Sequence, residues 1–241
     1  MAREILPSYL PAAKVTFTPK DGSAPKVIYR PYMAFHVEDL KRHALGNETG
    51  AILELGRRYY YGDLDVKQDF EQAYDYLKRA ADLGAQDALS MLAAYFLSDE
   101  ITMMPNDPEE GMKLLHAAAE AGSWDAMEKL AVVYRVGGQG IKPDHEKAFE
   151  WAENAERMVR VYWYFYTQPD FVDFTEVLRV LLNGHTRITL TLAHHCANGI
   201  GTKRDLDAAI SESLSFRTFW NAFERYGYTL EYRGKFLRAR P

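Results

Sequence analysis

The segment that decides the fold is AMEKLAVVYRVGGQGIKPDHEKAFEWAENA, residues 126–155. Ala126, Leu130 and Tyr134 lie four residues apart, a spacing that places them on one face of a helix. A glycine-rich stretch follows, and Asp144 then precedes a second series of spaced alanines. Because an aspartate accepts hydrogen bonds from the free amides of a first helical turn, Asp144 marks the start of a second helix. The segment therefore predicts two helices joined by a glycine turn.

The same pattern recurs along the chain, which predicts a repeat protein. The first three leucines of the pattern are 37 and 38 residues apart, and the fourth follows after 62 residues. One helix pair of this size cannot bury its own apolar face, whereas stacked pairs can, so the repeats predict an α-solenoid. The repeated leucines are Leu55, Leu92, Leu130 and Leu192, and the repeated aspartates are Asp69, Asp107, Asp144 and Asp205.

Local signals mark the ends of the helices. Asp69 and Asp107 are each followed three residues later by Gln or Glu, the spacing of a capping box. Pro108 stands at a first helical position, where proline is tolerated. Gly84 and Gly122 follow the second helices of the first two units, where a glycine typically ends a helix.

The pattern resembles the Sel-1-like repeat family, a relative of the tetratricopeptide repeats. The family unit reads approximately A-x-x-x-L-G-x-x-Y-x-x-G-x-G-V-x-x-D-x-x-x-A, followed after about seven residues by A-A-x-x-G. The third unit matches best, the fourth has Cys196 at the tyrosine position, and the second has SDEITMMPND in place of the glycine turn. The resemblance covers about residues 48–216. It implies an all-α, right-handed α/α solenoid of about four helix pairs.

Segments outside the units complete the predicted organisation. We expect an N-terminal arm or cap over residues 1–47, in which KVTFT and KVIYR form a hairpin and VEDLKRHALG a lead-in helix. Three repeats follow over residues 48–158 and an inserted helical arm over 159–186. The fourth repeat and a C-terminal capping helix, the aromatic segment RTFWNAFERYGYTLEYRGKFL, make up residues 187–241.

The insertion accounts for the long interval before the fourth leucine. The second helix of the third unit has Val159 where a glycine stop would fall, so we expect it to run on until Pro169. Phe171, Phe174, Leu178 and Leu181 or Leu182 then form another helical stripe, which we expect to end at Asn183-Gly184. The alternative is a degenerate fifth repeat.

Composition narrows the function classes. The net charge is -5, which argues against nucleic acid as a partner, although Phe216–Pro241 is basic. The single cysteine excludes an intramolecular disulfide and fits a reducing compartment. No signal-peptide core and no membrane-spanning apolar run is recognised, so we expect a cytoplasmic protein without membrane contact.

No motif for catalysis or cofactor binding stands out. CANGIGTKRD, residues 196–205, lacks the lysine position of a phosphate-binding loop and matches the turns of the other units. Adjacent residues on a helix do not share a face, so His194, His195 and Cys196 do not form a metal site. Asp63, Asp65 and Asp69 lack the glutamate of a calcium loop. We therefore expect no enzyme activity, cofactor, metal or small-molecule substrate.

The resemblance implies a protein-binding role. Proteins of this family mostly hold other proteins or peptides on the concave surface, which the first helix of each pair lines. Tyrosine and arginine are frequent in binding hot spots. The candidate residues that the repeat pattern does not assign to the core are Arg58, Tyr61, Arg135 and His195.

The aromatic run VYWYFY, residues 161–166, gives two further candidates. Tyr162 and Trp163 begin five consecutive aromatic residues, which point to all sides of a helix. One face packs on the arm. The remaining face either packs within the core of the insertion as well, or contacts a partner or a second copy of the chain. The preferred function is an adaptor or scaffold, the alternative is an immunity-type or regulatory protein that blocks one cognate partner, and an enzyme is the weakest alternative.

Overall fold

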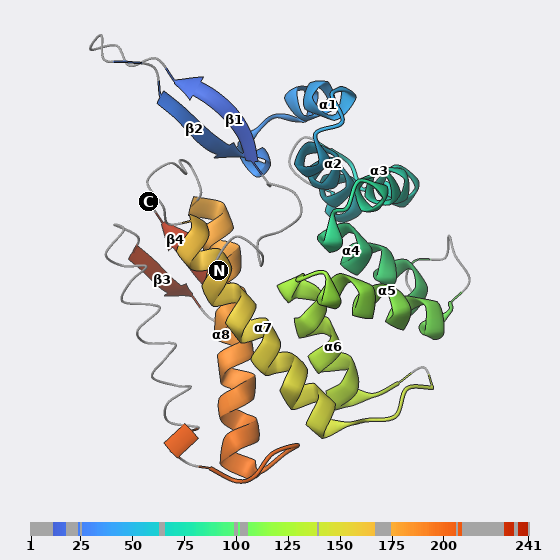
Figure 1. The fold of residues 1–241 in the computed structure, drawn as a ribbon, viewed down its shortest axis with the longest axis vertical. Helices are drawn as coiled ribbons and strands as arrows, with labels where there is room; N and C mark the ends of the chain where they lie inside the picture. The colour runs from blue at the N-terminus through green and yellow to red at the C-terminus, as the bar shows by residue number, and fades with distance from the viewer. Residues whose placement is uncertain are drawn as a thin grey trace.

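The computed structural model is a curved stack of antiparallel helix pairs (Figure 1). It describes residues 12–17, 24, 26–62, 66–98, 101, 106–138, 140–166, 175–205, 207–208, 229–233 and 236–240. The predicted all-α solenoid is confirmed. The first three pairs are α2 (Thr49–Tyr61) with α3 (Phe70–Asp82), α4 (Gln86–Leu97) with α5 (Pro108–Glu120), and α6 (Trp124–Val136) with α7 (His145–Tyr166), and α8 (Thr175–Asn198) opens the fourth.

The repeated leucines form the interior of the stack. Leu55 and Leu130 are fully buried, and Leu92 and Leu192 are nearly so. The small residues of the pattern let neighbouring helices approach closely: a Cβ atom added at Gly56 would lie 2.9 Å from Cδ2 of Leu77. Larger side chains at these positions would overpack the interface at a cost of about 1–3 kcal/mol.

The repeated aspartates cap the second helices as expected. Asp69 accepts a hydrogen bond from the amide of Gln72 at 3.0 Å, and the other three aspartates accept the equivalent bond. Each aspartate also donates its own amide to the carbonyl at the tyrosine position of the preceding helix. The four bonds are Asp69 to Tyr59 (2.8 Å), Asp107 to Phe96 (3.1 Å), Asp144 to Tyr134 (2.7 Å) and Asp205 to Cys196 (2.8 Å). The loop over residues 196–205 is therefore the same turn as in the other units.

The insertion lengthens α7 and α8 instead of adding a separate helix. The expected continuation of α7 is confirmed as far as Tyr166, whereas the expected end at Asn183-Gly184 is wrong, because α8 is continuous through both residues. A Cβ atom at Gly184 would overlap the indole ring of Trp124, so this glycine permits close packing. The expected boundary between residues 186 and 187 falls within α8. Pro169, Phe171 and Phe174 lie outside the described residues, as does the side chain of Leu178.

Short elements lie at both ends. The expected N-terminal hairpin is β1 (Ala12–Phe17) antiparallel to β2 (Lys26–Pro31), with Val15 opposite Ile28. A turn of 3-10 helix, η1 (Tyr32–Ala34), leads to the expected helix α1 (Val37–Leu45). At the other end, β3 (Thr229–Arg233) pairs with β4 (Phe236–Arg240), so this part of the predicted capping helix forms a hairpin. The part of the capping segment before β3, residues 217–228, lies outside the described residues.

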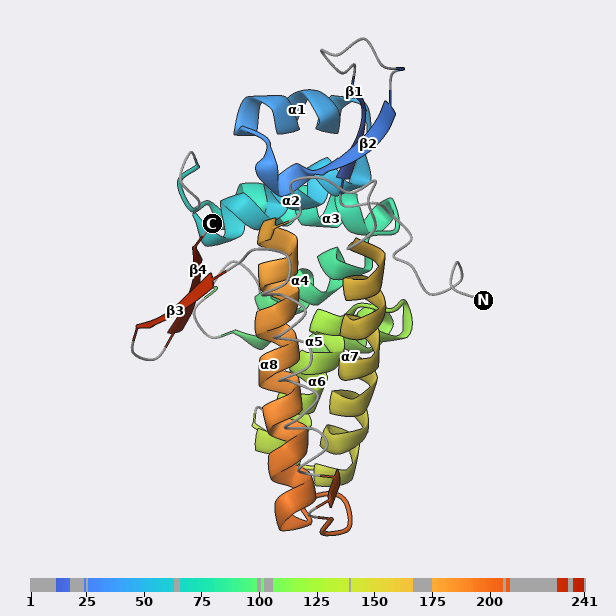
Figure 2. The same cartoon turned by 90° about the vertical axis from the view of Figure 1, so that its left-hand side faces the viewer.

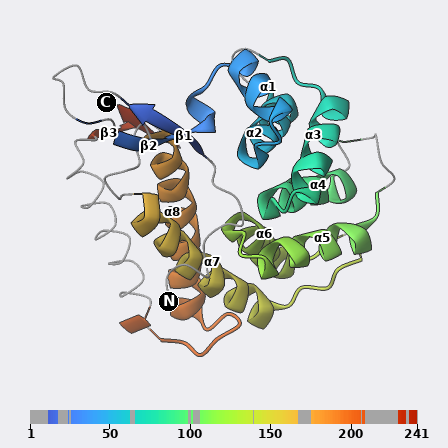
Figure 3. The ribbon, with the colours of Figure 1, turned by 45° about the horizontal axis from the view of Figure 1, so that its top comes forward.

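The curvature gives the stack an inner and an outer side. Figure 3 shows α2, α4, α6 and α8 on the inner side of the curve, with α3 and α5 outside. The lengthened parts of α7 and α8 rise along the stack toward α2, as Figure 2 shows. The first helices of the pairs therefore line the inner side, together with the arm formed by α7 and α8.

Candidate functional site

The inner side carries a surface with a regular register, which we call the concave surface. On the first helices of the pairs, most residues that line its cavities stand five, two or one positions before the repeated leucine, or two or six positions after it. These residues are Gly50, Leu53, Glu54, Arg57 and Tyr61 on α2; Asp87, Ser90, Met91, Ala94 and Ser98 at α4; Asp125, Glu128, Lys129 and Val132 on α6; and Arg187 on α8. Val136 and Leu190 occupy equivalent positions and extend the same surface.

Two cavities lie on the concave surface. The first has a volume of about 410 Å³ and lies between α2, η1 and the arm, where Leu53 and Tyr61 face Val180 and Leu181. The second has a volume of about 370 Å³ and lies between α4, α6 and α8. Both are lined by Asp125, Lys129 and Arg187, so these side chains stand where the two cavities meet.

A network of charged and polar side chains, the polar bridge, separates the cavities. It consists of Ser90, Asp125, Glu128, Lys129 and Arg187. The ammonium of Lys129 lies 2.7 Å from Oδ2 of Asp125 and 2.9 Å from Oγ of Ser90. Arg187 donates from Nε and Nη2 to the two carboxylate oxygens of Glu128, each at 2.6 Å. The bridge thus joins α4, α6 and α8 across the concave surface.

The polar bridge keeps its members charged. Burial alone would raise the pKa of Asp125, but the charge and hydrogen bond of Lys129 outweigh it and leave this pKa below its ordinary value. Burial would likewise lower the pKa of Lys129, but Asp125 holds it above its ordinary value. A hydrogen bond to Glu128 raises the pKa of Arg187. These shifts favour a deprotonated Asp125 beside a protonated Lys129 and a protonated Arg187.

Arg58 is buried in the core, so the expectation that it lies outside the core is wrong. Its side chain is 6% exposed and donates to Glu54 at 3.0 Å, to the carbonyl of Met33 at 3.0 Å and to that of Phe35 at 2.7 Å. Arg58 therefore links the segment of η1 to α2 of the first repeat through hydrogen bonds. The neighbouring Arg57 also pairs with Glu54 but lines the first cavity.

His195 is likewise buried, and the residue before it, His194, lies on the surface. The side chain of His195 is 1% exposed, and its ring stacks on Phe149 at 6.2 Å. Burial, together with the nearby basic groups, lowers its pKa, which favours the neutral ring. The exposed His194, two positions after Leu192, carries the concave-surface register instead.

The other two candidates on the first helices are exposed. Tyr61 is 62% exposed and lines the first cavity, as a concave-surface residue should. Arg135 is exposed near the end of α6, next to the concave-surface residue Val136. Sequence reasoning missed Arg57, Val132, Arg187 and Leu190, although counting from the repeated leucines would have found them.

Tyr162 and Trp163 are buried in the core, so neither offers an exposed contact surface. The hydroxyl of Tyr162 donates to the carbonyl of Gly122 at 3.2 Å and accepts a hydrogen bond from Gln86 at 3.4 Å. Trp163 belongs to the same apolar cluster. The side chains of residues 164–166 lie outside the described part, so contact with a second copy through them stays a prediction.

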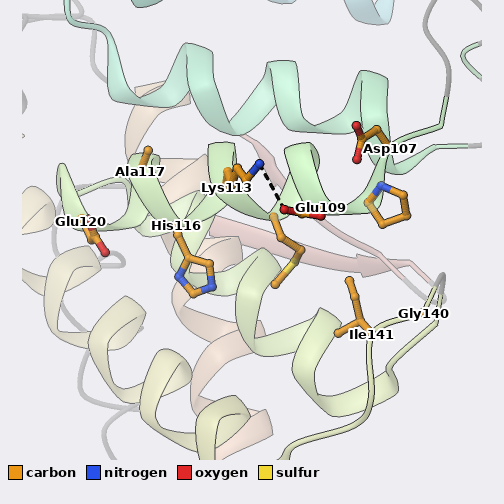
Figure 4. Close-up of a pocket in the computed structure, with 10 residues that line it drawn as sticks. Asp107, Glu109, Lys113, His116, Ala117, Glu120, Gly140 and Ile141 are labelled. Atoms are coloured by element: carbon orange, nitrogen blue, oxygen red, sulfur yellow. Dashed lines mark ion pairs between the residues drawn. The ribbon is translucent and has the colours of Figure 1, made fainter.

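A wider hollow of about 760 Å³ lies away from the concave surface, against α5 and the turn after α6 (Figure 4). Its charged residues include Lys113, which pairs with Glu109 at 3.3 Å. His116 lies 3.0 Å from the hydroxyl of Tyr134. Both side chains of this ion pair are exposed, so the pair contributes little free energy.

The described residues contain no group of three or more His, Cys, Asp and Glu side chains placed to hold a metal ion. Asp63 and Asp65 lie outside the described part of the chain, whereas Asp69 is the helix cap described above. Within the described ranges, no helix has the length and apolar character needed to cross a membrane. Cys196 is a buried free thiol.

The comparisons with known proteins identify the repeats. The Sel1 repeat matches residues 49–84, 86–123, 124–158 and 192–211, slightly more than half of the chain. A solved Sel1 repeat protein from Oxalobacter formigenes is 30% identical, covers 50% of this chain and 88% of its own, and has a TM-score of 0.41. Among curated proteins, none matches the chain.

Two other solved structures are more distant in sequence. A protective antigen of uropathogenic Escherichia coli that displays an SLR fold is 21% identical, with 80% of this chain and 49% of that chain covered and a TM-score of 0.29. An immunity protein from Pseudomonas aeruginosa is 13% identical, with 76% of this chain and 73% of that chain covered and a TM-score of 0.41. The family assignment therefore rests on the four segments that match the Sel1 repeat, each of which contains one of the repeated leucines.

Proposed function

Because the chain belongs to the Sel1 repeat family, we propose that it is a non-catalytic adaptor or scaffold that binds a segment of a partner protein on its concave surface. Solenoids of stacked repeats commonly use an extended concave face for binding. In this chain the first helix of every pair contributes to that face. The proposed location is the cytoplasm, which fractionation of the native cell would test.

One observation carries the proposal: the exposed apolar side chains gather on the concave surface. Of the seven large exposed hydrophobic residues in the described part of the chain, four belong to this surface and a fifth, Val180, lines its first cavity. The other two, Leu45 and Leu83, lie at the ends of α1 and α3. Exposed apolar patches rimmed by polar groups typically mark interaction sites. The five residues are Tyr61, Val132, Val136, Val180 and Leu190.

The chemistry of this surface favours recognition by contact over catalysis. Asp125 and Glu128 are each paired with a basic group, so neither carboxylate is placed as a free base. Burying apolar surface contributes about 25 cal/mol for each Å² removed from water. Binding would therefore draw its affinity from the apolar side chains, with the polar bridge setting orientation.

Affinity purification with quantitative mass spectrometry tests the proposal. The concave variant combines Val132→Asn with Leu190→Asn, and the control makes the same chemical change at Leu45 and Leu83. Both pairs are exposed, so all four substitutions should leave the fold intact. We expect the concave variant to lose the proteins captured by the wild type and the control to retain them.

The same experiment separates the alternatives. Equal capture by wild type and concave variant would refute the concave surface as the binding site. One stoichiometric partner would favour the immunity-type alternative, and several partners would favour an adaptor.

A further inference from the structure

We propose that the concave surface takes a short, uncharged peptide segment of its partner. Two apolar side chains of that segment occupy the two cavities, and a backbone carbonyl between them accepts a hydrogen bond from Arg187. This inference rests on the proposed function and specifies the kind of partner that the surface fits.

The arm forms one wall of the first cavity. Val180, Leu181 and Asn183 line this cavity opposite the side chains of α2. The arm is firmly packed there, because Gly184 lies against the ring of Trp124 and Leu181 is buried in the core. A group that enters this cavity therefore contacts both the arm and α2.

The polar bridge divides the surface and sets the spacing of the contacts. Asp125, Lys129 and Arg187 line both cavities, so a segment that enters both must pass over the bridge. Volumes of about 410 and 370 Å³ lie at the lower end of the range typical of small-molecule binding sites, so each cavity has room for a large side chain. A partner segment with one apolar side chain on each side of the polar bridge matches this arrangement.

Arg187 is the hydrogen-bond donor available at the crossing point. A guanidinium carries five N–H groups, and two of those on Arg187 bond to Glu128. The other three make no hydrogen bond to a described residue, and the side chain is 62% exposed. The ammonium of Lys129, by contrast, already bonds to Asp125 and to both oxygens of Ser90.

The surrounding charges favour a neutral acceptor over a carboxylate. Glu128 already neutralises Arg187, and Asp125 is close enough to influence the pKa of its guanidinium. A carboxylate of the partner would be repelled by both acids, whereas a peptide carbonyl would not. Glu54 is likewise paired with arginines, and Asp87 accepts a hydrogen bond from Ser123 at 2.5 Å. The described residues that line the two cavities thus include hydrogen-bond donors but carry no net positive charge.

A display library of random dodecapeptides, panned on the immobilised full chain, supplies the probe. Enriched peptides are then synthesised and titrated by calorimetry. We expect two apolar residues separated by a short uncharged spacer. Replacing either apolar residue of the peptide by glycine should abolish binding, and this control needs no change to the protein.

Matched variants test the role of Arg187. Arg187→Gln removes the guanidinium, and Glu128→Gln breaks the same ion pair but leaves the guanidinium in place. We expect the first to weaken peptide binding about 10- to 100-fold, the loss of one or two charge-assisted hydrogen bonds, and the second to leave it unchanged or tighter. Ala94→Trp and Asn183→Trp, which each fill one cavity, should each abolish binding.

The outcomes distinguish this inference from the proposed function. Equal losses in the two bridge variants, or enrichment of acidic peptides, would overturn it. Enrichment of no peptide, while a captured protein still depends on Val132 and Leu190, would overturn the short segment but leave the proposed function standing. Capture that ignores Val132 and Leu190 would refute the proposed function itself.

Discussion

Arg58 and Arg57 are adjacent arginines that pair with the same carboxylate, and replacing each by methionine should give opposite results. Arg58 is buried and bonds to Glu54 and to the carbonyls of Met33 and Phe35. Arg57 also bonds to Glu54, through Nε and Nη2, but its side chain is 36% exposed. Methionine preserves most of the apolar stem in both cases, so the comparison isolates the guanidinium.

The magnitude follows from the groups left behind. Arg58→Met removes a charged donor from two carbonyls, and a buried acceptor without a donor costs about 1–3 kcal/mol. Glu54 keeps its bond to Arg57, so the full cost of an unpaired buried charge does not apply. We expect Arg58→Met to lower the free energy of unfolding by about 2–4 kcal/mol. Arg57→Met should lower it by about 1 kcal/mol or less, as for an exposed ion pair.

Urea unfolding followed by circular dichroism measures both values, and limited proteolysis locates the loss. Because repeat stability is a sum of local terms, cleavage of the Arg58→Met variant should begin in the segment of η1 and α1. A loss below about 1 kcal/mol, or equal losses in the two variants, would show that Arg58 does not fasten the N-terminal cap.

Three further predictions concern the turns, the arm and its pH dependence. Gly201→Ala should lower the melting temperature of the protein far more than Gly140→Ala. Both glycines have positive φ, but only the Cβ atom at residue 201 would overlap a backbone carbonyl. Similar melting temperatures of the two variants would contradict this packing. Tyr162→Phe should cost about 1 kcal/mol in urea unfolding through its lost hydroxyl bonds, and an unchanged midpoint would contradict those bonds. Burial would raise the pKa of Glu156, but hydrogen bonds from His185 and the neighbouring arginine hold this pKa below its ordinary value. The charged carboxylate therefore stabilises the fold at neutral pH, and this contribution is lost as the pH falls through the lowered pKa. Glu156→Gln should therefore flatten the loss of stability between about pH 6 and about pH 3, and an unchanged pH profile would show that this carboxylate does not contribute.

The sequence was sufficient to predict the helix pairs, because their signals are local. An aspartate cap, a glycine turn and a buried leucine each act within one or two turns of helix, and all recur at Leu55, Leu92, Leu130 and Leu192. The fourth turn could be recognised only because three others define it. Repetition thus supplied the information that a single unit lacks.

The concave surface was harder to predict, because its direction depends on how neighbouring units pack. Successive residues on a helix point about 100° apart, so a displacement of one position moves a side chain from the surface into the core. Arg58 and His195 were expected on the surface but are buried, whereas Tyr61 is exposed. Gly184 shows the same limit, because its role depends on the ring of Trp124, some sixty residues earlier in the chain.

Hydroxyl-radical footprinting of the full chain, with and without a purified captured partner, tests the central claim most directly. The method reports the exposure of individual side chains. We predict that the partner protects Tyr61, Val132 and Leu190 on the concave surface while Leu45 and Leu83 react as before. Protection of Leu45 and Leu83, with the three concave residues unchanged, would contradict binding on the concave surface.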